Sequence, residues 1–586
     1  LMDADLAENP PEVREITARL YEGDAERRLQ QELILGFGTQ KLVEALKLQV
    51  ELFHYNEGHP AFHLLALWMH LKEAGYDLHA AQEEARLRVL FTTHTPVPAG
   101  HDAFPPELLQ KYLYDVVRRL GIPWERFLHW GEMPGEAGKF SLTAFCLRFA
   151  GQTNAVSQLH TRVSQRMFAG LYEGYRPQEL PIRGITNGVH VATWQAPEWS
   201  RSRRTWETHQ ILRSALLSYL RRRLLSEPGP VGYLEATRAF FAQMDENALL
   251  IGFARRFATY KRHGMLFEYE SLRRVIAEEP IRLIIAGKAH PRDEAGKKML
   301  RTVWQRSLEP PFLGKVLFVP DYDIQLARYL IQGVDVWLNL PIFGNEASGT
   351  SGMKAALNGV LHLSIPDGWW AEVDPTEAGG WSIPVCQSDD PEIRDAWEAT
   401  QLAYLLREEV LPAYRARDAR GIPMEWVARM ERAQAYAATR FSTTRMLGEY
   451  VEKLYLPAYQ QLTTLSKEAF EERLAFLTRI EEHWHELKVK SVVLPPFAER
   501  AHPTRAPFEV EVEVEAGDLP IEALQAEIVF ESADGQVQAF RLESVGKGRF
   551  RGQVQIADAG VYHYAVRIYA WDAFLQERLW NWVHVV

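Results

Sequence analysis

The chain of 586 residues is 47% apolar, which is enough for more than one hydrophobic core, so two large domains and an appendage are predicted. Its 77 acidic side chains outnumber the 66 basic ones and give a net charge of −11, which disfavours nucleic acid or an anionic membrane as a partner. The two cysteines, Cys146 and Cys386, exclude a disulfide framework and favour a reducing, cytoplasmic location.

The first region, residues 1–198, alternates helical and strand-like patterns and is predicted to be an α/β domain. Residues 26–49 and 59–77 have helical spacing, whereas residues 86–96 have the pattern of a strand followed by a turn. The chain starts at Leu1, in a loop-like stretch, rather than at methionine. We therefore expect this region to be the remainder of a longer N-terminal domain.

Three polar motifs of this region lie near expected turns. They are YNEGHPAF with His59, FTTHTPVPAGHDAF with His94, and RGITNGVHVATW with Asn187. From local sequence alone, the histidines are typical of structural or exposed side chains, and the Asn-Gly pair is typical of a turn. The arginine-rich helical stretch that follows, residues 199–245, is predicted to present a solvated face.

The second region, residues 199–490, contains short runs rich in β-branched residues between helical patterns. The runs are residues 248–256, 281–290, 315–323 and 334–341. Strands of this composition are buried on both faces, so a doubly wound parallel sheet is predicted. Ligands of such sheets bind at the carboxyl ends of the strands, which makes the loops after these runs the candidate site.

One of these loops carries a basic run, GFARRFATYKRHG, with Arg255, Arg256 and Lys261 just past a strand end. In an acidic protein, this charge and position predict a phosphate site. The alternative for a short basic run is a solvated surface. No HExxH, paired CxxC, EF-hand or P-loop pattern occurs in the sequence, so no metal site is expected.

The segment EASGTSGMK, residues 346–354, sets Lys354 behind a loop of glycine and hydroxyl residues. Such a loop lets backbone N–H groups approach an anion, and the run MKAALNGVL suits a helix whose N-terminal end is positive. Lys354 is then either a point-charge clamp for a phosphate or the amine that is linked covalently to pyridoxal phosphate. Spacing by itself leaves both interpretations open.

The ordered succession of NEGHP, TTHTP, TNGVH, ARRFATYKR, AGKA and EASGTSGMK resembles the α-glucan phosphorylases, which act on glycogen, starch and maltodextrin. The resemblance covers residues 1 to about 480. It implies two Rossmann-like domains facing a cleft, which is the GT-B glycosyltransferase architecture, and pyridoxal 5′-phosphate as the cofactor. It also leads us to expect that a glycine-rich phosphate loop of this family belongs to a part of the protein before Leu1.

The resemblance assigns the cofactor and phosphate residues by position. Lys354 matches the cofactor lysine, while Arg256 and Lys261 match residues that hold the substrate phosphate beside the cofactor phosphate. These three are the predicted catalytic residues. Besides Lys354, the predicted cofactor contacts are Thr350, Ser351, Arg255 and Tyr322.

Two positions depart from the family pattern. Arg255 stands where well-known members have lysine, which keeps the charge but changes the geometry. Asp323 stands where they have arginine, so it is not assigned as a ligand. Gly287 and Lys288 match a segment that lines the cleft; a helix-cap or surface role is the alternative for this lysine.

The same resemblance assigns a sugar pocket. Its predicted members are His94, Asn187, Glu346, Ser348 and Gly349. An asparagine side chain offers a donor and an acceptor to sugar hydroxyls, and a carboxylate accepts from a ring hydroxyl. His59 is expected to shape this pocket rather than to react.

The C-terminal part is helical after about residue 392 and then changes character. A proline-bearing linker, residues 491–507, precedes strictly alternating runs that predict a small antiparallel β-sandwich over residues 508–586. Its aromatic residues either stack on sugars or fill the core and pack against the enzyme body. They include Trp571, Phe574, Trp580 and Trp582.

The function implied is phosphorolysis of a terminal α-1,4-linked glucose by inorganic phosphate, giving glucose 1-phosphate with retained configuration. One alternative is a nucleotide-sugar-dependent glucan synthase, which shares the architecture but needs no cofactor lysine. Another is a non-catalytic glucan-binding protein. The expected partners are an α-glucan and phosphate, and a homo-oligomer remains an option.

Overall fold

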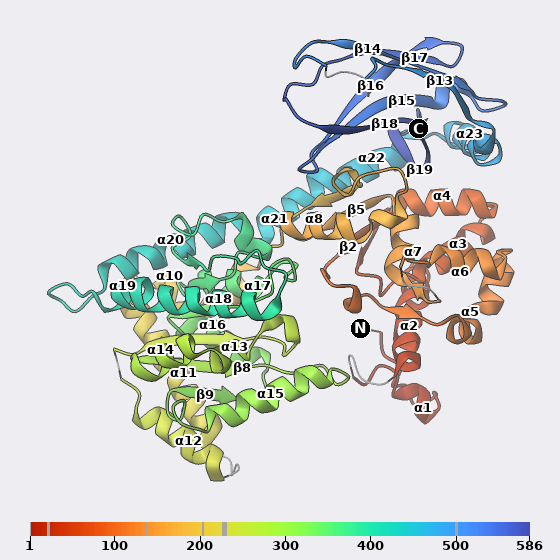
Figure 1. Cartoon of the computed structure of the whole chain (residues 1–586). Coiled ribbons are helices and arrows are strands. Elements are labelled where there is room, and N and C mark those ends of the chain that lie inside the picture. Colours follow the sequence, from red (N-terminus) through yellow and green to blue (C-terminus); the bar gives the residue numbers. More distant parts are fainter. Residues whose placement is uncertain are drawn as a thin grey trace.

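The computed structural model describes residues 2–19, 24–135, 138–201, 204–225, 231–245, 247–497 and 502–586. Leu1, part of the arginine-rich stretch and residues 498–501 of the predicted linker therefore lie outside the described residues. The described chain forms two α/β bodies and a C-terminal sheet body (Figure 1). Within it, no helix is both long and apolar enough to cross a bilayer.

The first body surrounds a four-stranded parallel sheet with the order β1-β2-β5-β6. These strands are β1 (Phe53–Asn56), β2 (Val89–Thr93), β5 (Gln152–Ala155) and β6 (Ile182–Gly184), and the short strands β3 (Ala103–Phe104) and β4 (Phe140–Ser141) pair separately. The helices are α1 (Pro11–Arg14), α2 (Ala25–Ala45), α3 (His63–Glu73), α4 (Leu78–Arg88), α5 (Pro106–Leu120), α6 (Trp124–Trp130), α7 (Leu142–Phe149) and α8 (Gln158–Met167).

The second body surrounds a six-stranded parallel sheet with the order β12-β11-β10-β7-β8-β9. Its strands are β7 (Leu249–Ala254), β8 (Ile281–Ala286), β9 (Val316–Val319), β10 (Val336–Asn339), β11 (Leu361–Ser364) and β12 (Trp381–Ser382). The four predicted runs coincide with β7, β8, β9 and β10, and every residue of these strands is buried. Burial on both faces explains why these strands are mostly apolar, with Arg282 and Asn339 as buried polar exceptions.

Helices connect and cover the strands of the second body and then return toward the first (Figure 1). They are α9 (Val191–Trp194), α10 (Glu198–Arg201), α11 (Thr205–Leu225), α12 (Val231–Ala242), α13 (Met265–Glu268), α14 (Glu270–Glu278), α15 (Glu294–Ser307), α16 (Ile324–Gly333), α17 (Thr350–Ala356), α18 (Pro391–Leu405), α19 (Leu411–Arg415), α20 (Met424–Arg440), α21 (Thr443–Tyr450), α22 (Leu456–Thr464) and α23 (Lys467–His483). Short 3-10 turns are η1 (Pro98–Gly100), η2 (Ala169–Leu171), η3 (Pro177–Glu179), η4 (Thr259–Lys261), η5 (Gly368–Glu372), η8 (Trp484–Glu486) and η9 (Ile521–Ala523).

Two helices of the returning segment contain π-helical turns, η6 (Leu406–Val410) and η7 (Val451–Tyr455). A proline follows each turn, Pro412 in one case and Pro457 in the other. Proline has no N–H group and its ring collides with the carbonyl four residues earlier, so the wider turn lets the helix continue past it.

The C-terminal body is an antiparallel sheet with the order β13-β14-β17-β16-β15-β18-β19. Its strands are β13 (Lys488–Val493), β14 (Phe508–Glu515), β15 (Leu524–Ser532), β16 (Val537–Gly546), β17 (Arg549–Val554), β18 (Tyr562–Asp572) and β19 (Glu577–Val585). In β14 the alternation FEVEVEVE buries the phenylalanine and the three valines against the core. The first strand, β13, begins before the predicted linker.

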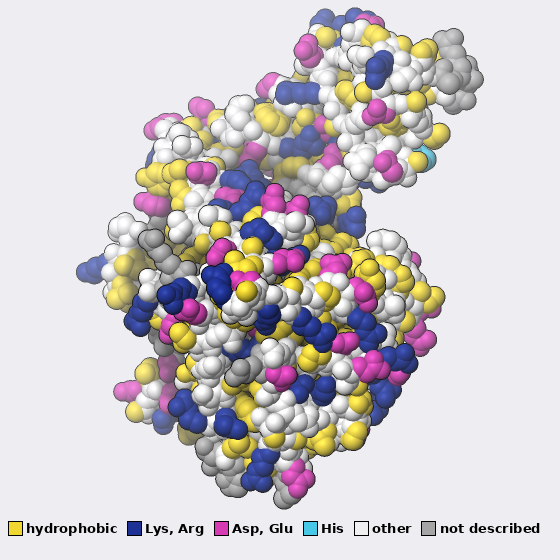
Figure 2. Space-filling model, turned by 90° about the vertical axis from the view of Figure 1, so that its left-hand side faces the viewer, with side chains coloured by type: hydrophobic (Ala, Val, Ile, Leu, Met, Phe, Trp, Pro, Cys, Tyr) yellow, Lys and Arg dark blue, Asp and Glu magenta, His cyan; other side chains and the backbone are white. Residues whose placement is uncertain are grey.

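The predicted fold class is confirmed as a mixed α/β chain with parallel sheets and a C-terminal antiparallel sheet. Figure 2 shows the C-terminal body projecting from the rest of the molecule. Basic and acidic side chains are interspersed over the face drawn there, so neither sign dominates that face.

The prediction that the arginine-rich stretch, residues 199–245, presents a solvated face is wrong for Arg213. Arg213 of the arginine-rich helix α11 is buried rather than solvated. Its guanidinium binds Asp335, and it also donates to the Tyr414 hydroxyl at 2.9 Å and the Ala248 carbonyl at 2.6 Å. Arg213 therefore lies at the amino-terminal edge of the sheet, while the leucines of α11 pack along one face of that sheet. The arginine supplies the counter-charge that the buried Asp335 needs.

Candidate active site

The carboxyl edge of the second sheet gathers the motifs predicted to bind phosphate. Arg255 follows β7, Gly287 follows β8, Glu346 lies in the loop after β10, and Asp367 follows β11. Because the strands are parallel, these positions share one edge of the sheet. A Cβ atom at Gly287 would lie 2.0 Å from the Arg255 carbonyl oxygen, so glycine is required for the two loops to approach this closely.

Arg255, Lys261 and Glu346 form a buried charged cluster at this edge. The Arg255 guanidinium and the Lys261 ammonium both bind the same Glu346 carboxylate oxygen. Burial alone would raise the pKa of Glu346, but the charges of Arg255 and Lys261 lower it to about 2. Burial and the neighbouring Arg255 lower the pKa of Lys261 to about 8. At neutral pH the cluster therefore carries two positive charges against one negative charge.

Unsatisfied donors in this cluster show that it fits an anion. The Arg255 Nε and Nη1 atoms are buried, and among the described residues no hydrogen-bond partner reaches them. The Ser348 hydroxyl is buried and unpartnered in the same sense. Burying polar groups without partners is costly, so their presence together indicates a place for a charged, oxygen-rich group such as a phosphate.

Asp367 is a site residue that the sequence did not reveal. Its carboxylate accepts from the backbone N–H groups of Asn345 at 3.1 Å, Glu346 at 3.0 Å and Gly368 at 2.7 Å. Burial and the nearby Glu346 charge raise the pKa of Asp367 to about 7. It thus fixes the backbone that presents Glu346. No motif marked it, because it comes from the loop after a different strand.

Lys354 lies in the last turn of α17, whose N-terminal cap is Gly349 in a left-handed conformation with φ of 79°. Its ammonium sits 3.9 Å from the centre of the Trp194 ring. Burial lowers the pKa of Lys354. Asn358 holds Trp194 by donating to its carbonyl oxygen at 3.0 Å. The amine rests on an aromatic face. Because burial lowers its pKa, it loses its proton more readily than an exposed lysine, which suits a covalent link.

The remaining predicted cofactor and phosphate residues are more dispersed. Arg256 and Lys288 are exposed. The Ser351 hydroxyl accepts from Trp337 Nε1 at 3.2 Å, and the neighbouring Thr350 begins α17. Tyr322 packs beside the core under α11 and α16, and burial raises its pKa to about 12. The structure thus brings Arg255 and Lys261 together at Glu346, whereas Arg256, Lys288 and Tyr322 lie outside that cluster.

Asp323 caps a helix and does not lie in the charged cluster. Its carboxylate caps α16 by accepting from the Leu326 backbone N–H at 2.7 Å, and it forms an ion pair with Arg223 at 2.8 Å. These contacts give the Asp323 carboxylate a structural role, as a helix cap and as the partner of an arginine.

The first body presents its predicted sugar residues at the carboxyl edge of its own sheet. His94 follows β2 and Asn187 follows β6. Burial lowers the pKa of His94 to about 4, so its ring is neutral, and its Nε2 atom lies 2.9 Å from Asn56 Oδ1. This contact assigns the proton to Nε2 and leaves Nδ1 as an acceptor for a hydroxyl. Arg445 of α21 donates to the Asn187 carbonyl at 2.9 Å.

Comparisons with known proteins identify the family. Residues 236–381 match a profile described as carbohydrate phosphorylase, and residues 484–579 match one described as glycogen phosphorylase C-terminal domain. A maltodextrin phosphorylase of Thermococcus litoralis is 35% identical over 97% of this chain and 71% of its own length. The chain belongs to the carbohydrate phosphorylase family.

Glycogen phosphorylases give similar matches. That of Mycobacterium tuberculosis is 39% identical over 84% of this chain and 62% of its own length, and that of Aquifex aeolicus is 36% identical over 78% and 70%. The chain thus spans 62 to 71% of the length of these phosphorylases. The match to the C-terminal profile starts at residue 484, which places β13 within that domain.

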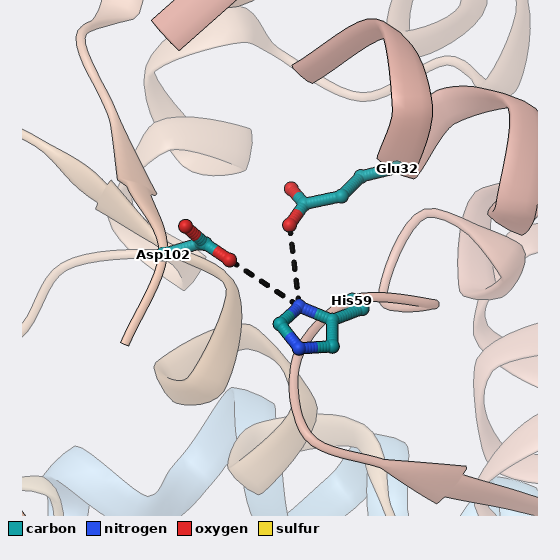
Figure 3. Close-up of side chains that lie close together, drawn as sticks. All are labelled: Glu32, His59 and Asp102. Carbon is teal, nitrogen blue, oxygen red and sulfur yellow. Dashed lines mark hydrogen bonds and ion pairs between the residues drawn. The ribbon is translucent and has the colours of Figure 1, made fainter. Parts of the chain in front are cut away.

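A partly buried polar cluster, drawn in Figure 3, holds His59 of the NEGHP loop in this phosphorylase family member. His59 Nδ1 lies 3.3 Å from both Glu32 Oε1 and Asp102 Oδ2. The Arg28 guanidinium lies 2.8 Å from the same ring nitrogen, 2.9 Å from Asp102 and 3.1 Å from Glu32. Three groups of a kind that can bind a metal ion thus share the Arg28 guanidinium. The positive charge of Arg28 repels a metal ion at this place, so the cluster is poorly suited to bind one.

This cluster predicts a pH-dependent stability. Burial raises the pKa of Glu32 to about 8, and hydrogen bonds to Asp102 and Glu32 raise that of His59 to about 9 although burial opposes them. Both groups then hold protons more tightly in the folded chain, so stability falls as pH rises, from about 4.5 to 8 for Glu32 and from about 6.5 to 9 for His59. Between pH 6.5 and 8 both groups contribute to the fall. We expect Glu32→Gln to remove about 2 kcal/mol of that fall, measured from melting temperatures across this range.

A matched control for this prediction is Glu84→Gln on α4, which removes another buried carboxylate bound to an arginine, Arg88 at 2.6 Å. Its melting temperature is expected to follow the pH dependence of the unaltered chain. An unchanged slope in Glu32→Gln would contradict the assignment.

Proposed function

We propose that this chain carries the catalytic core of an α-1,4-glucan phosphorylase, which transfers a terminal glucose from glycogen or maltodextrin to inorganic phosphate. The observation that carries the proposal is the buried Arg255–Lys261–Glu346 cluster with its unpartnered donors, on the sheet edge next to the α17 loop with Lys354. Membership of the family and relatives named maltodextrin and glycogen phosphorylases support the same activity.

The proposed architecture is GT-B, with Rossmann-like bodies on the two sides of the site. The strand order of the second sheet, read from β7 as first, is 3-2-1-4-5-6, which is the order of dinucleotide-binding Rossmann folds. Sugar residues His94 and Asn187 come from the first body, and phosphate residues come from the second. Glu372 of the second body accepts from the Thr186 hydroxyl at 2.8 Å, which joins the bodies beside Asn187.

We assign the cofactor as pyridoxal 5′-phosphate, held by Lys354 with Thr350, Ser351 and Tyr322 as further contacts. When bound, it supplies a phosphate group whose ionisation near neutrality lets it exchange protons with the substrate phosphate. A lysine of lowered pKa and a loop of small residues fit this group.

In the proposed reaction the charged side chains hold and neutralise phosphates. Arg255 and Lys261, together with the exposed Arg256, offset the repulsion between the two phosphate groups. The positive charge that develops on the sugar attracts the attacking phosphate oxygen and keeps it close. Glu346 stays ionised at neutral pH because its pKa is about 2, so it accepts hydrogen bonds from sugar hydroxyls. Ser348 and Gly349 complete this side of the sugar pocket.

Borohydride reduction followed by peptide mass analysis tests the proposal. A pyridoxyl adduct on the peptide with Lys354, together with release of glucose 1-phosphate from maltodextrin and phosphate, is the expected result. An unmodified peptide with transfer from a nucleotide sugar would support a glucan synthase instead. Glucan binding without either reaction, in a protein of the full length of its relatives, would support a non-catalytic role. A cytoplasmic location and a homo-oligomeric state remain predictions.

Glu57 is expected to position the sugar-binding histidine. Its carboxylate accepts from the His94 backbone N–H, and its own backbone is left-handed, with φ of 65°. We expect Glu57→Ala to raise KM for maltodextrin roughly tenfold with a smaller change in kcat, because the hydrogen bond that fixes His94 is lost.

Glu57→Gln serves as the control, because its amide oxygen still accepts from His94 and both substitutions keep a Cβ atom in the same left-handed backbone. Its KM is expected to stay close to that of the unaltered chain. Equal KM values for Glu57→Ala and Glu57→Gln would contradict the positioning role.

A further inference from the structure

A cavity of about 210 Å³ lies between the first body and the C-terminal sheet. The loop at Gly174–Arg176, between η2 and η3, forms one wall, and strands β15, β18 and β19 form the other. In Figure 1 the C-terminal sheet covers this part of the first body. The cavity is separate from the edge of the second sheet, because none of its lining residues comes from the second body.

Small apolar side chains form the floor of this cavity. Val529 of β15 pairs directly with Ala565 of β18, and Val585 of β19 pairs with Arg567 two residues further along β18. Directly opposed residues share one face of an antiparallel sheet, so these side chains point toward the first body together. Because successive side chains of a strand point to opposite faces of the sheet, these residues form a small, flat apolar surface opposite the loop with Gly174.

Balanced ion pairs form the polar walls. Arg176 binds Glu531 at 2.5 Å across the cavity. The buried Arg567 binds Glu179 of the first body at 2.6 Å and Glu527 of β15 at 2.8 Å. Arg578 also binds Glu527, at 3.0 Å, so three arginines stand against three carboxylates and neither sign of charge is in excess.

Two polar atoms beside the cavity are enclosed by protein. Among the described residues, no hydrogen bond of good geometry reaches the Arg567 Nε atom or the Tyr175 hydroxyl, and both atoms are buried away from the open space of the cavity. His563, opposite Glu531 on β18, adds an exposed ring at the rim.

We propose that this cavity binds one glucose residue of an α-glucan, as a second carbohydrate site of the chain. A neutral, hydroxyl-rich ring has one flat apolar face for the Val529–Ala565 floor and hydroxyls for the paired arginines and carboxylates. A phosphate or nucleotide would have to displace Glu531 or Glu179 from its arginine, which the balanced charges disfavour. The volume is below the 300 Å³ or more of typical drug-sized sites, and so suits a single ring.

The choice of glucan as the ligand rests on the proposed function. A polymer held at this second point would stay attached while its end occupies the sheet edge. Binding at the cavity would raise the effective concentration of glucan ends at the sheet edge, and this effect needs no contact between the two sites.

Equilibrium dialysis of labelled maltotriose against the full chain tests the proposal by counting sites. We expect two sites per chain, one at each location. Ala565→Leu fills the cavity floor and is expected to leave one site. The matched control is Ala539→Leu, since Ala539 also pairs with Val529 on the same face but is exposed on β16 outside the cavity; it should keep both sites.

The possible outcomes separate this proposal from the proposed function. One site in the unaltered chain that Ala565→Leu removes would sustain the cavity site and contradict maltotriose binding at the sheet edge. The same number of sites in the unaltered chain and in Ala565→Leu would overturn the cavity site. If Ala565→Leu fails to fold, crystals of the unaltered chain soaked in maltotriose decide: a glucose ring in the cavity supports the proposal, whereas water alone overturns it.

A second variant measures the polar walls. Arg176→Gln keeps a donor but loses the charge that pairs with Glu531, and its half-exposed side chain makes folding defects less of a concern. We expect it to weaken the cavity site roughly fivefold, with kcat on saturating maltodextrin unchanged. Unchanged affinity at both sites would count against the wall assignment.

Discussion

Replacing Lys354 by alanine is expected to lower the rate of phosphorolysis by about 10² to 10⁴-fold or more, because the group that exchanges protons with the substrate phosphate would no longer be anchored. Lys354→Arg should be as inactive, since a guanidinium does not give up its proton and cannot form the covalent link. The loss would appear in kcat measured as glucose 1-phosphate release. The pyridoxyl absorbance of the purified chain should disappear in both variants.

The control for this prediction is Lys298→Ala, which removes an exposed lysine of α15 in the same body. It is expected to keep full activity and the bound chromophore. Activity of Lys354→Ala within tenfold of the unaltered chain would show that Lys354 is a simple charge beside Trp194. The interpretation of the EASGTSGMK loop as a cofactor site would then fail.

Replacing Arg213 by methionine should produce the largest loss of stability. Asp335 is fully buried and accepts from His209 Nε2 at 2.7 Å, from the Leu250 backbone N–H at 2.7 Å and from Arg213. Burial would raise the pKa of Asp335, but the Arg213 charge holds it below its usual range. Without the arginine, a buried carboxylate loses its main counter-charge, which costs about 3 to 5 kcal/mol.

The measurement is chemical unfolding of the second body followed by tryptophan fluorescence, with Trp206 and Trp337 near the altered group. Arg222→Met, an exposed position of the same helix α11, is the matched control and should change the free energy of unfolding by less than about 0.5 kcal/mol. A double variant, Arg213→Met with Asp335→Leu, is expected to recover part of the loss, because both charges leave together. Equal stability of Arg213→Met and Arg222→Met would refute the proposed role of the ion pair.

The motifs of the phosphate edge could be predicted because each is local. Arg255 and Lys261 follow one buried strand by a few residues, and the residues 346–354 follow another. Parallel strands place such loops on a common edge whatever the details of packing. What the sequence could not supply is the pairing of both cations with Glu346, since that depends on how two loops about 90 residues apart fold toward each other.

Asp367 and Glu57 show the same limit for single residues. Asp367 matters because it accepts three backbone N–H groups of the site loop, and Glu57 because its carboxylate fixes the next strand's loop. Neither position has a local signature. A positive φ at a glutamate is a feature of the folded loop, which the identity of the residue does not announce.

The amino-acid sequence by itself determined the apolar runs that became buried strands, the alternation that became the C-terminal sheet, and the ordered motifs that mark the family. These features depend on residues close together in the sequence, because their spacing decides which side chains share the solvent-exposed face of a helix or strand. The tertiary structure alone decided which distant charges lie together: Arg213 with Asp335, Arg28 with Asp102, and Arg567 with Glu179 across two bodies. A charge tolerates burial only beside a partner, and that partner is chosen by the fold rather than by distance along the chain.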